Sequence, residues 1–124
     1  MPKNYENDFA LYEVRDRLLY ISYKEGLYID YAAARLIVDD RLMIQSYQSC
    51  AIVCDVSTIH DVAADAREYL ATYGCNLAKA VAIYSATHTM RNLAAYFVSI
   101  NKPMAPTKIF DNLEDAEEFA IEHI

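Results

Sequence analysis

The stretch VCDVSTIHDVAADAREYL, residues 53–70, changes its pattern halfway along. It begins as an apolar strand that ends at Asp55, passes through a short polar turn, and continues as an alanine-rich segment with the composition of a helix. A strand that leads into a helix is the basic unit of α/β proteins, and the connecting loops of such proteins often carry functional side chains. Residues 53–70 therefore indicate a fold class and also a candidate surface.

The same pattern recurs on either side of this stretch. The runs CAIVCDV (50–56) and AVAIYS (80–85) are apolar on both faces, which predicts two adjacent parallel strands in the middle of a sheet covered by helices. A helix is predicted after each run, the first over about 62–73 and the second reaching about 100. Asp61 is predicted to cap the first of these helices and Gly74 to end it, while Thr87 or Thr89 is predicted to cap the second.

The opening of the chain predicts a hairpin, and its close predicts one more strand and helix. Residues 9–15 and 18–23 alternate between polar and apolar side chains, and a short extended piece, 27–29, follows them. Asp30 is predicted to cap a helix over about 31–45, whose exposed face carries Arg35, Asp39 and Arg41. The last elements are a strand over TKIF (107–110) and an amphipathic helix capped by Asp111 or Asn112, with Leu113, Ala116, Phe119 and Ala120 as its apolar stripe.

This order of elements predicts an α/β fold. A β-hairpin followed by β-α repeats gives a single-layer mixed sheet with a parallel portion and about four helices. We expect residues 1–124 to form one domain, because no linker, repeat or low-complexity tract interrupts a chain in which 55% of the residues are hydrophobic.

Composition also excludes several classes of function. A net charge of −7, without a basic cluster, argues against nucleic acid and anionic membranes as partners. With two glycines there is no glycine-rich phosphate loop, and no cofactor is predicted. The chain shows neither an apolar run of membrane-spanning length nor a signal peptide, so a cytoplasmic protein is expected. Cys50, Cys54 and Cys75 match no metal or redox spacing and are interpreted as small buried side chains.

The element order, with VCDVSTI (53–59) leading into a helix, resembles the STAS domain, the fold of bacterial anti-sigma-factor antagonists. The closing stretch NKPMAPTKIFDNLEDAEEFA (101–120) is similar to that of small bacterial STAS-like proteins of unassigned function. The antagonists carry an Asp-Ser-(Ser/Thr)-Gly motif at the start of the second helix, where the serine is phosphorylated. When Asp55 is matched to the aspartate of the preceding strand, the motif falls on residues 63–66.

This chain departs from the motif at every position, because the four residues there are Ala63, Ala64, Asp65 and Ala66. Ala64 has no hydroxyl group to accept a phosphoryl group, so the resemblance does not extend to the phosphorylation switch. Asp65 places a negative charge in the first turn of the helix, which favours the helix dipole. A second interpretation is that Asp65 imitates a permanently phosphorylated state.

Polar side chains cluster after the two central strands. Asp55, Ser57, His60, Asp61 and Asp65 are the residue types of a metal or acid–base site, but their spacing enforces no such geometry. Ser57 and Thr58 are typical turn residues, and His60 is expected to be exposed on the turn. No metal site and no catalytic residue are predicted here.

An alternative site lies along the carboxyl ends of the parallel strands, where open α/β sheets usually bind ligands. Ser57, His60, His88 and Arg91 would lie at this rim, next to two helix N-termini, and could hold a small anion.

A third feature is the number of tyrosines, eleven in a chain without tryptophan. Several lie in or just after the opening hairpin: Tyr12, Tyr20, Tyr23, Tyr28 and Tyr31. Such rings either cover one face of the sheet or form a surface for self-association or a partner.

The first interpretation is thus a non-enzymatic STAS-like domain that acts by protein–protein contact through Ser57, Thr58, His60, Ala64 and Asp65. A weak enzyme or anion-binding protein that uses the rim is the first alternative. A self-associating structural domain, which would form a homodimer through the tyrosine-rich hairpin, is the second.

Overall fold

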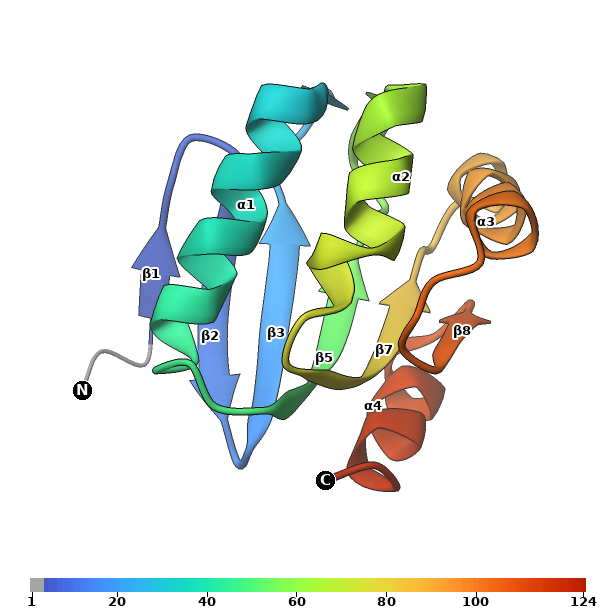
Figure 1. Ribbon diagram of the computed structural model, residues 1–124. Helices are drawn as coiled ribbons and strands as arrows, with labels where there is room; N and C mark the ends of the chain where they lie inside the picture. Colours follow the sequence, from blue (N-terminus) through green and yellow to red (C-terminus); the bar gives the residue numbers. More distant parts are fainter. Residues whose placement is uncertain (1–3) are drawn as a thin grey trace.

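A mixed sheet of six strands runs through the centre of the computed structural model, which describes residues 4–124 (Figure 1). The first three strands are antiparallel, and the remaining strands continue parallel to the third. In spatial order the strands are β1 (Asn4–Glu6), β2 (Ala10–Arg15), β3 (Leu18–Tyr23), β5 (Cys50–Asp55), β7 (Ala78–Tyr84) and β8 (Thr107–Phe110). The predicted mixed sheet with a parallel portion is confirmed, although β1 was not expected.

The two apolar runs are neighbouring strands in the middle of this sheet, as predicted. β5 pairs with β3 on one side and with β7 on the other, both in parallel. Successive side chains of β5 face opposite sides of the sheet, so Ile52 and Cys54 belong to one core cluster while Ala51 and Val53 belong to another. Both faces of β5 are therefore buried, which explains why its sequence is apolar throughout.

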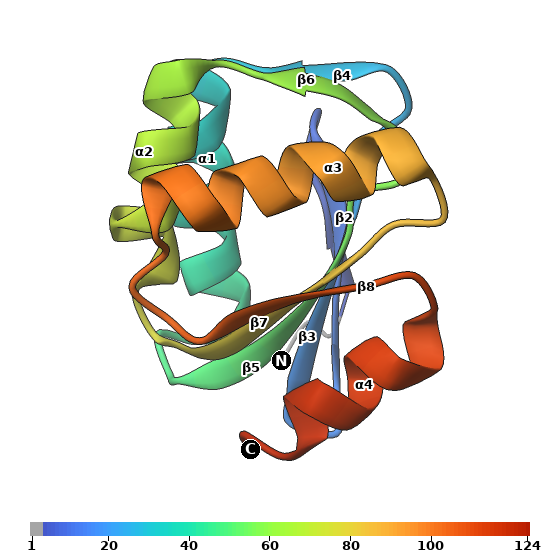
Figure 2. The ribbon, with the colours of Figure 1, turned by 90° about the vertical axis from the view of Figure 1, so that its right-hand side faces the viewer.

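Helices cover the two faces unequally. The helices are α1 (Tyr31–Ile44), α2 (Ala64–Ala71), α3 (His88–Tyr96) and α4 (Leu113–Ile121). Figure 2 shows the sheet nearly edge-on, with α1, α2 and α3 on one side and α4 on the other. α4 packs on β5 and β7 through alanines, since Ala116 and Ala120 meet Ala51 and Ala82 and all four are fully buried. Leu113, predicted for the apolar stripe of α4, is instead exposed.

Within residues 4–124, three of the four α-helices have a side-chain cap at their N-terminus. In each case the side-chain oxygen accepts a hydrogen bond from the backbone N–H three residues further on, which satisfies one of the N–H groups that a helix leaves free. The capping residues are Asp30, Thr87 and Asn112. Of the alternatives left open by the sequence, Thr87 rather than Thr89 and Asn112 rather than Asp111 are thus the caps.

The prediction that Asp61 caps the second helix is wrong. Residues 59–62 form a strand, β6 (Ile59–Val62), which pairs in parallel with β4 (Leu27–Ile29) in a separate two-stranded sheet. Ile59 is buried in the core, while His60 and Asp61 are exposed. Consequently α2 begins only at Ala64.

The predicted end of this helix is also corrected. α2 stops at Ala71, and Gly74 lies in a short 3₁₀ turn, Tyr73–Cys75, without a left-handed φ. The third helix extends beyond α3 as a π-helical turn, Phe97–Asn101, which ends at Lys102 in left-handed backbone.

Arg41, predicted for the exposed face of α1, is only 3% exposed. Its guanidinium donates to the carbonyl oxygens of Gly74 (3.0 Å) and Asn76 (2.8 Å) and to the side chain of Gln45. Burial lowers the pKa of Arg41. This buried cation joins the end of α1 to the loop after α2.

Candidate functional site

The five residues predicted to contact a partner lie along β6 and its two flanking segments. We call this surface the shelf, formed by Ser57, Thr58, His60, Ala64 and Asp65. All are exposed except Ser57, which is half-buried. The prediction that His60 is exposed is therefore confirmed, although His60 lies on a strand and not in a turn.

Side-chain hydrogen bonds attach the turn at Ser57 and Thr58, the first part of the shelf, to neighbouring elements. The hydroxyl oxygen of Ser57 accepts from the backbone N–H of Ala86 (3.0 Å), in the turn after β7. The hydroxyl of Thr58 donates to the carbonyl oxygen of Tyr23 (2.8 Å), at the end of β3. Asp55 accepts from the backbone N–H of Ser57 (3.0 Å). The turn is thus attached to the strands on both sides of β5.

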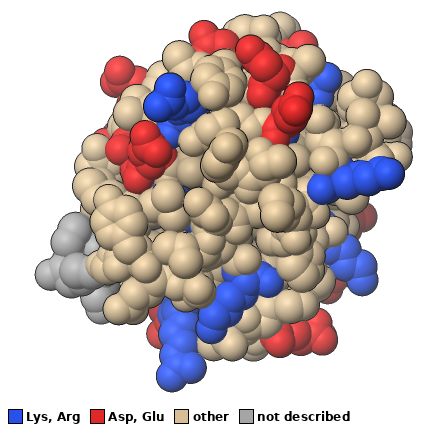
Figure 3. Space-filling model, in the orientation of Figure 1, with Lys and Arg blue, Asp and Glu red and all other residues tan. Residues whose placement is uncertain are grey.

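The helix that borders the shelf lacks a side-chain cap. Ala63 has the extended backbone of an N-cap residue (φ −63°, ψ 152°), but its methyl group accepts no hydrogen bond. Asp65 lies in the first turn of α2, where its charge favours the helix dipole. Asp61 and Glu68 are exposed beside it. Figure 3 shows acidic side chains gathered at the end of the molecule where α1 and α2 begin.

The rim residues are brought together only in part. The bond between Ser57 and Ala86 joins the turns after β5 and β7. Arg91 donates to the carbonyl oxygen of Ser85 (2.9 Å), so its guanidinium is attached to the second of these turns. His60 and His88 are exposed, one on β6 and the other in the first turn of α3. Anion binding at this rim stays a prediction.

The tyrosines of the opening hairpin divide into two groups. Tyr12 is buried beneath α1 and donates to the carbonyl oxygen of Ile37 (2.9 Å), while Tyr20 donates to Glu117 of α4 (2.5 Å). Burial and, next, the bond to Glu117 raise the pKa of Tyr20 to about 12. Tyr28 and Tyr31 are exposed. Tyr12 is therefore buried, Tyr20 and Tyr23 are half-buried, and Tyr28 and Tyr31 lie at the surface.

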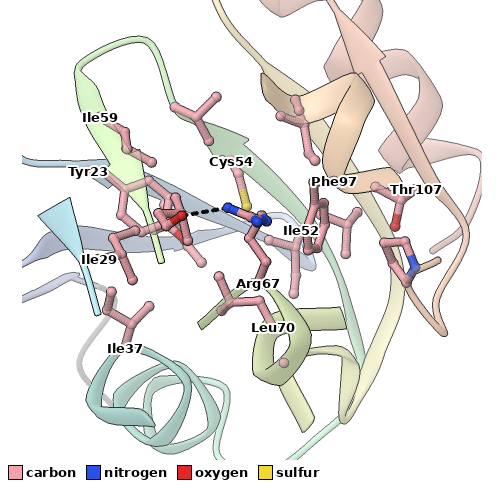
Figure 4. Close-up of a pocket in the computed structure, with 18 of the residues that line it drawn as sticks. Tyr23, Ile29, Ile37, Ile52, Cys54, Ile59, Arg67, Leu70, Phe97 and Thr107 are labelled. Carbon is pink, nitrogen blue, oxygen red and sulfur yellow. Dashed lines mark hydrogen bonds between the residues drawn. The ribbon is translucent and has the colours of Figure 1, made fainter. Parts of the chain in front are cut away.

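A cavity of about 130 Å³, which the sequence did not predict, lies between the sheet and helices α1, α2 and α3. Its wall is mostly aliphatic, and the residues labelled in Figure 4 include Ile29, Ile37, Ile52, Leu70 and Phe97. The guanidinium group of Arg67, on α2, lies among these side chains (Figure 4).

Arg67 makes two contacts with the protein. Its Nη1 donates to the carbonyl oxygen of Val62 (2.7 Å), and its guanidinium carbon lies 5.3 Å from the centre of the Tyr96 ring. Its Nε is buried and has no partner among residues 4–124. The spacing of α2 contained a signal for this position, because residue 67 follows Ala63 by four and precedes Leu70 by three, on the apolar face of the helix.

Cysteine chemistry at the site is limited by burial. All three cysteines are free thiols, of which Cys54 is buried and lines the cavity, while Cys50 and Cys75 are half-buried. Burial raises the pKa of Cys54 to about 12 and that of Cys50 to about 11. Among residues 4–124, no three histidine, cysteine or acidic side chains are grouped so that they could hold a metal ion.

Comparison with protein families matches residues 12–124 to the family described as a domain of unknown function, DUF7793. The chain belongs to this family. A comparison of this chain with curated proteins found no significant match. In the part of the chain that the structure describes, no helix has the length and apolar character needed to cross a membrane.

Among solved structures, this DUF7793 chain is similar to an uncharacterized protein of the DUF3478 family from Shewanella loihica PV-4, described as having a SpoIIAA-like fold. The two share 11% sequence identity with a TM-score of 0.58, and the match covers 94% of this chain and 90% of the other. At this identity the likeness concerns the fold alone. It confirms the STAS-like fold that the sequence predicted.

Proposed function

We propose that the chain is a non-enzymatic STAS-like domain that acts by protein–protein contact, with the shelf as its docking surface. The observation that carries the proposal is that the side chains of Ser57 and Thr58 attach the shelf to β3 and to the turn after β7, while four of its five residues are exposed. A surface fixed in this way loses little conformational entropy when a partner binds.

The small residues at the start of α2 support this proposal. Ala63 and Ala64 occupy the cap and the first helical position, where a serine or aspartate would stabilise the helix more. Alanine allows another chain to approach the helix closely. Stability given up at one position is common where a surface has a function.

Charge indicates the kind of partner. The acidic side chains exposed on and beside the shelf are Asp61, Asp65 and Glu68, and the whole chain carries a net charge of −7. A protein with a basic docking surface would associate faster and with better specificity than an acidic one. Because Ala64 offers no hydroxyl, the proposed contact is constitutive and does not depend on phosphorylation at that position.

A substitution at Ala64 tests this proposal. Ala64→Arg introduces a long cationic side chain into the contact, at an expected cost to folding of only about 0.3–1 kcal/mol from the helix dipole. We expect a protein with a basic surface to co-purify with the wild-type chain from lysate of the source organism and to be lost with Ala64→Arg. The matched control is Ala95→Arg on α3, an exposed helical alanine outside the shelf, which should retain the partner.

Two results would contradict the proposal. One is a partner that binds wild type and Ala64→Arg equally well. The other is a partner lost equally with Ala95→Arg, because a general effect of added positive charge would explain that loss. Thermal unfolding of both variants shows whether the fold is intact.

A second copy of the chain is the other candidate partner, favoured by a row of tyrosines on α1, α2 and the 3₁₀ turn after α2. The rings of Tyr31 and Tyr69 meet edge to face with centres 5.4 Å apart, and Tyr73 continues the row at 5.3 Å from Tyr69. Tyr31 and Tyr73 are exposed, and the middle of this face carries few charges (Figure 3). A dimer in sedimentation experiments that Tyr31→Ser and Tyr73→Ser convert to monomer would support this candidate, whereas a wild-type monomer at all concentrations would exclude it.

A further inference from the structure

The cavity beneath α2 and α3 has the composition of a binding site for a small apolar anion. We propose that it binds a monocarboxylate with an apolar body of about six carbon atoms, whose carboxylate pairs with Arg67. This site is separate from the shelf surface, and the inference does not depend on the proposed protein contact.

The electrostatics of the cavity wall favour an anion. The wall contains two charged side chains, Arg41 and Arg67, and no acidic side chain of residues 4–124 contributes to it. Neither arginine forms an ion pair within this part of the chain. A cation in apolar surroundings is costly unless a group of opposite charge or several acceptors compensate it.

The two arginines differ in how many hydrogen-bond acceptors compensate the charge of the guanidinium group. Arg41 donates to three acceptors, the side chain of Gln45 and two backbone carbonyl groups, so its role is structural. Arg67 has one hydrogen bond to a carbonyl group, and its Nε–H is buried without a partner in residues 4–124. A carboxylate accepts charge-assisted hydrogen bonds from such a group and would pair its charge.

Position makes Arg67 suitable for this pairing. The guanidinium is positioned by its hydrogen bond to the carbonyl oxygen of Val62 and by the ring of Tyr96, whose centre lies 5.3 Å away. A guanidinium held in one orientation loses less entropy on binding than a free side chain. The surrounding aliphatic side chains of Ile29, Ile37 and Leu70 would contact the apolar body of the ligand (Figure 4).

Volume sets the size of the ligand. An apolar cavity of about 150 Å³ accommodates benzene, so the 130 Å³ found here fits a body of about six carbon atoms. Heptanoate carries a hexyl body of this size on its carboxylate. A long-chain fatty acid or a lipid would exceed the cavity.

Titration of the wild-type chain with a matched pair of ligands gives the first test. Heptanoate and heptanamide have the same shape and differ in charge. We expect heptanoate to bind about tenfold more tightly, which corresponds to the difference between a charge-assisted and a neutral hydrogen bond. In methyl NMR spectra, the resonances of Ile29, Ile37 and Ile52 should shift with bound heptanoate.

A series of carboxylates tests the size of the site and separates small acids from lipids. From butyrate to heptanoate, each added methylene group should tighten binding by about fourfold. Beyond about octanoate the gain should stop, because the cavity is full. A gain that continues through laurate and palmitate would contradict the proposed size and indicate a lipid surface or a larger pocket.

Substitution of Arg67 tests its role. Arg67→Met keeps the volume of the side chain and removes the charge, so we expect heptanoate to bind about tenfold more weakly and heptanamide to change by less than about threefold. The matched control, Arg35→Met, removes an exposed arginine of α1 and should change neither affinity. Ala94→Leu, at the cavity wall, should weaken both ligands by occupying part of the space.

Three results would overturn the proposal. They are equal affinity of the wild type for heptanoate and heptanamide, no binding of either at about 1 mM, and unchanged heptanoate affinity in a folded Arg67→Met variant. If Arg67→Met fails to fold, the comparison of the two ligands on the wild type and the effect of Ala94→Leu still decide the question.

Discussion

The missing cap of α2 leads to a prediction of increased stability. Ala63 already has extended backbone, as do Asp30, Thr87 and Asn112 at the other three helix starts. In Ala63→Ser, the new hydroxyl oxygen is placed to accept from the N–H of Ala66, three residues further on. A side-chain cap in place of alanine stabilises a helix by about 1 kcal/mol.

This gain should be measurable by thermal unfolding. From about 2.1 cal/mol/K per residue, the entropy of unfolding of 124 residues is about 0.26 kcal/mol/K, so about 1 kcal/mol raises Tm by about 4 °C. Thr87→Ala, which removes a cap that is present, should lower Tm by a similar amount. Ala95→Ser, on the exposed face of α3, controls for the hydroxyl itself and should not raise Tm. A Tm of Ala63→Ser at or below that of wild type would refute this reasoning.

Three further predictions follow from burial. Ile52→Asp should unfold the domain, because an unpaired carboxylate buried beneath α1 costs several kcal/mol, and the total free energy of unfolding of a domain is about 5–15 kcal/mol. A cooperative transition near the wild-type Tm would contradict this. The raised pKa of Tyr20 favours the neutral phenol in the folded state, so its contribution to stability should be lost as pH rises from about 10 to about 12, and urea unfolding of Tyr20→Phe should show a shallower alkaline decline. Cys54 should react with a thiol reagent at pH 8 only after unfolding, and rapid modification in the native protein would show that it is accessible.

Sequence patterns predicted the central part of this fold well because they report on local geometry. Apolar runs on both faces required covered parallel strands, and Asp30 stands directly before a helical pattern, so β5, β7 and the start of α1 could be located. Residues 59–62 were missed because a strand of four residues shows too little alternation to be separated from a turn.

The surroundings of Arg41 and Arg67 could not be predicted from such local patterns. Charged side chains are usually exposed, so the sequence predicts Arg41 at the surface of α1, whereas two of the three acceptors that stabilise it in the interior are carbonyl groups of a loop more than thirty residues away. The cavity around Arg67 depends on how three helices pack on the sheet. No local pattern contains that information, although the position of Arg67 on the apolar face of α2 was visible in the spacing.

The most direct test of the account is to map the contact with the partner on the chain. Backbone amide NMR spectra of the labelled protein would be recorded with and without the purified partner recovered by the wild-type chain. We expect the largest shifts to fall on residues 57–65 and to vanish with Ala64→Arg. Shifts confined to residues 69–73 or to α4, with residues 57–65 unchanged, would contradict it.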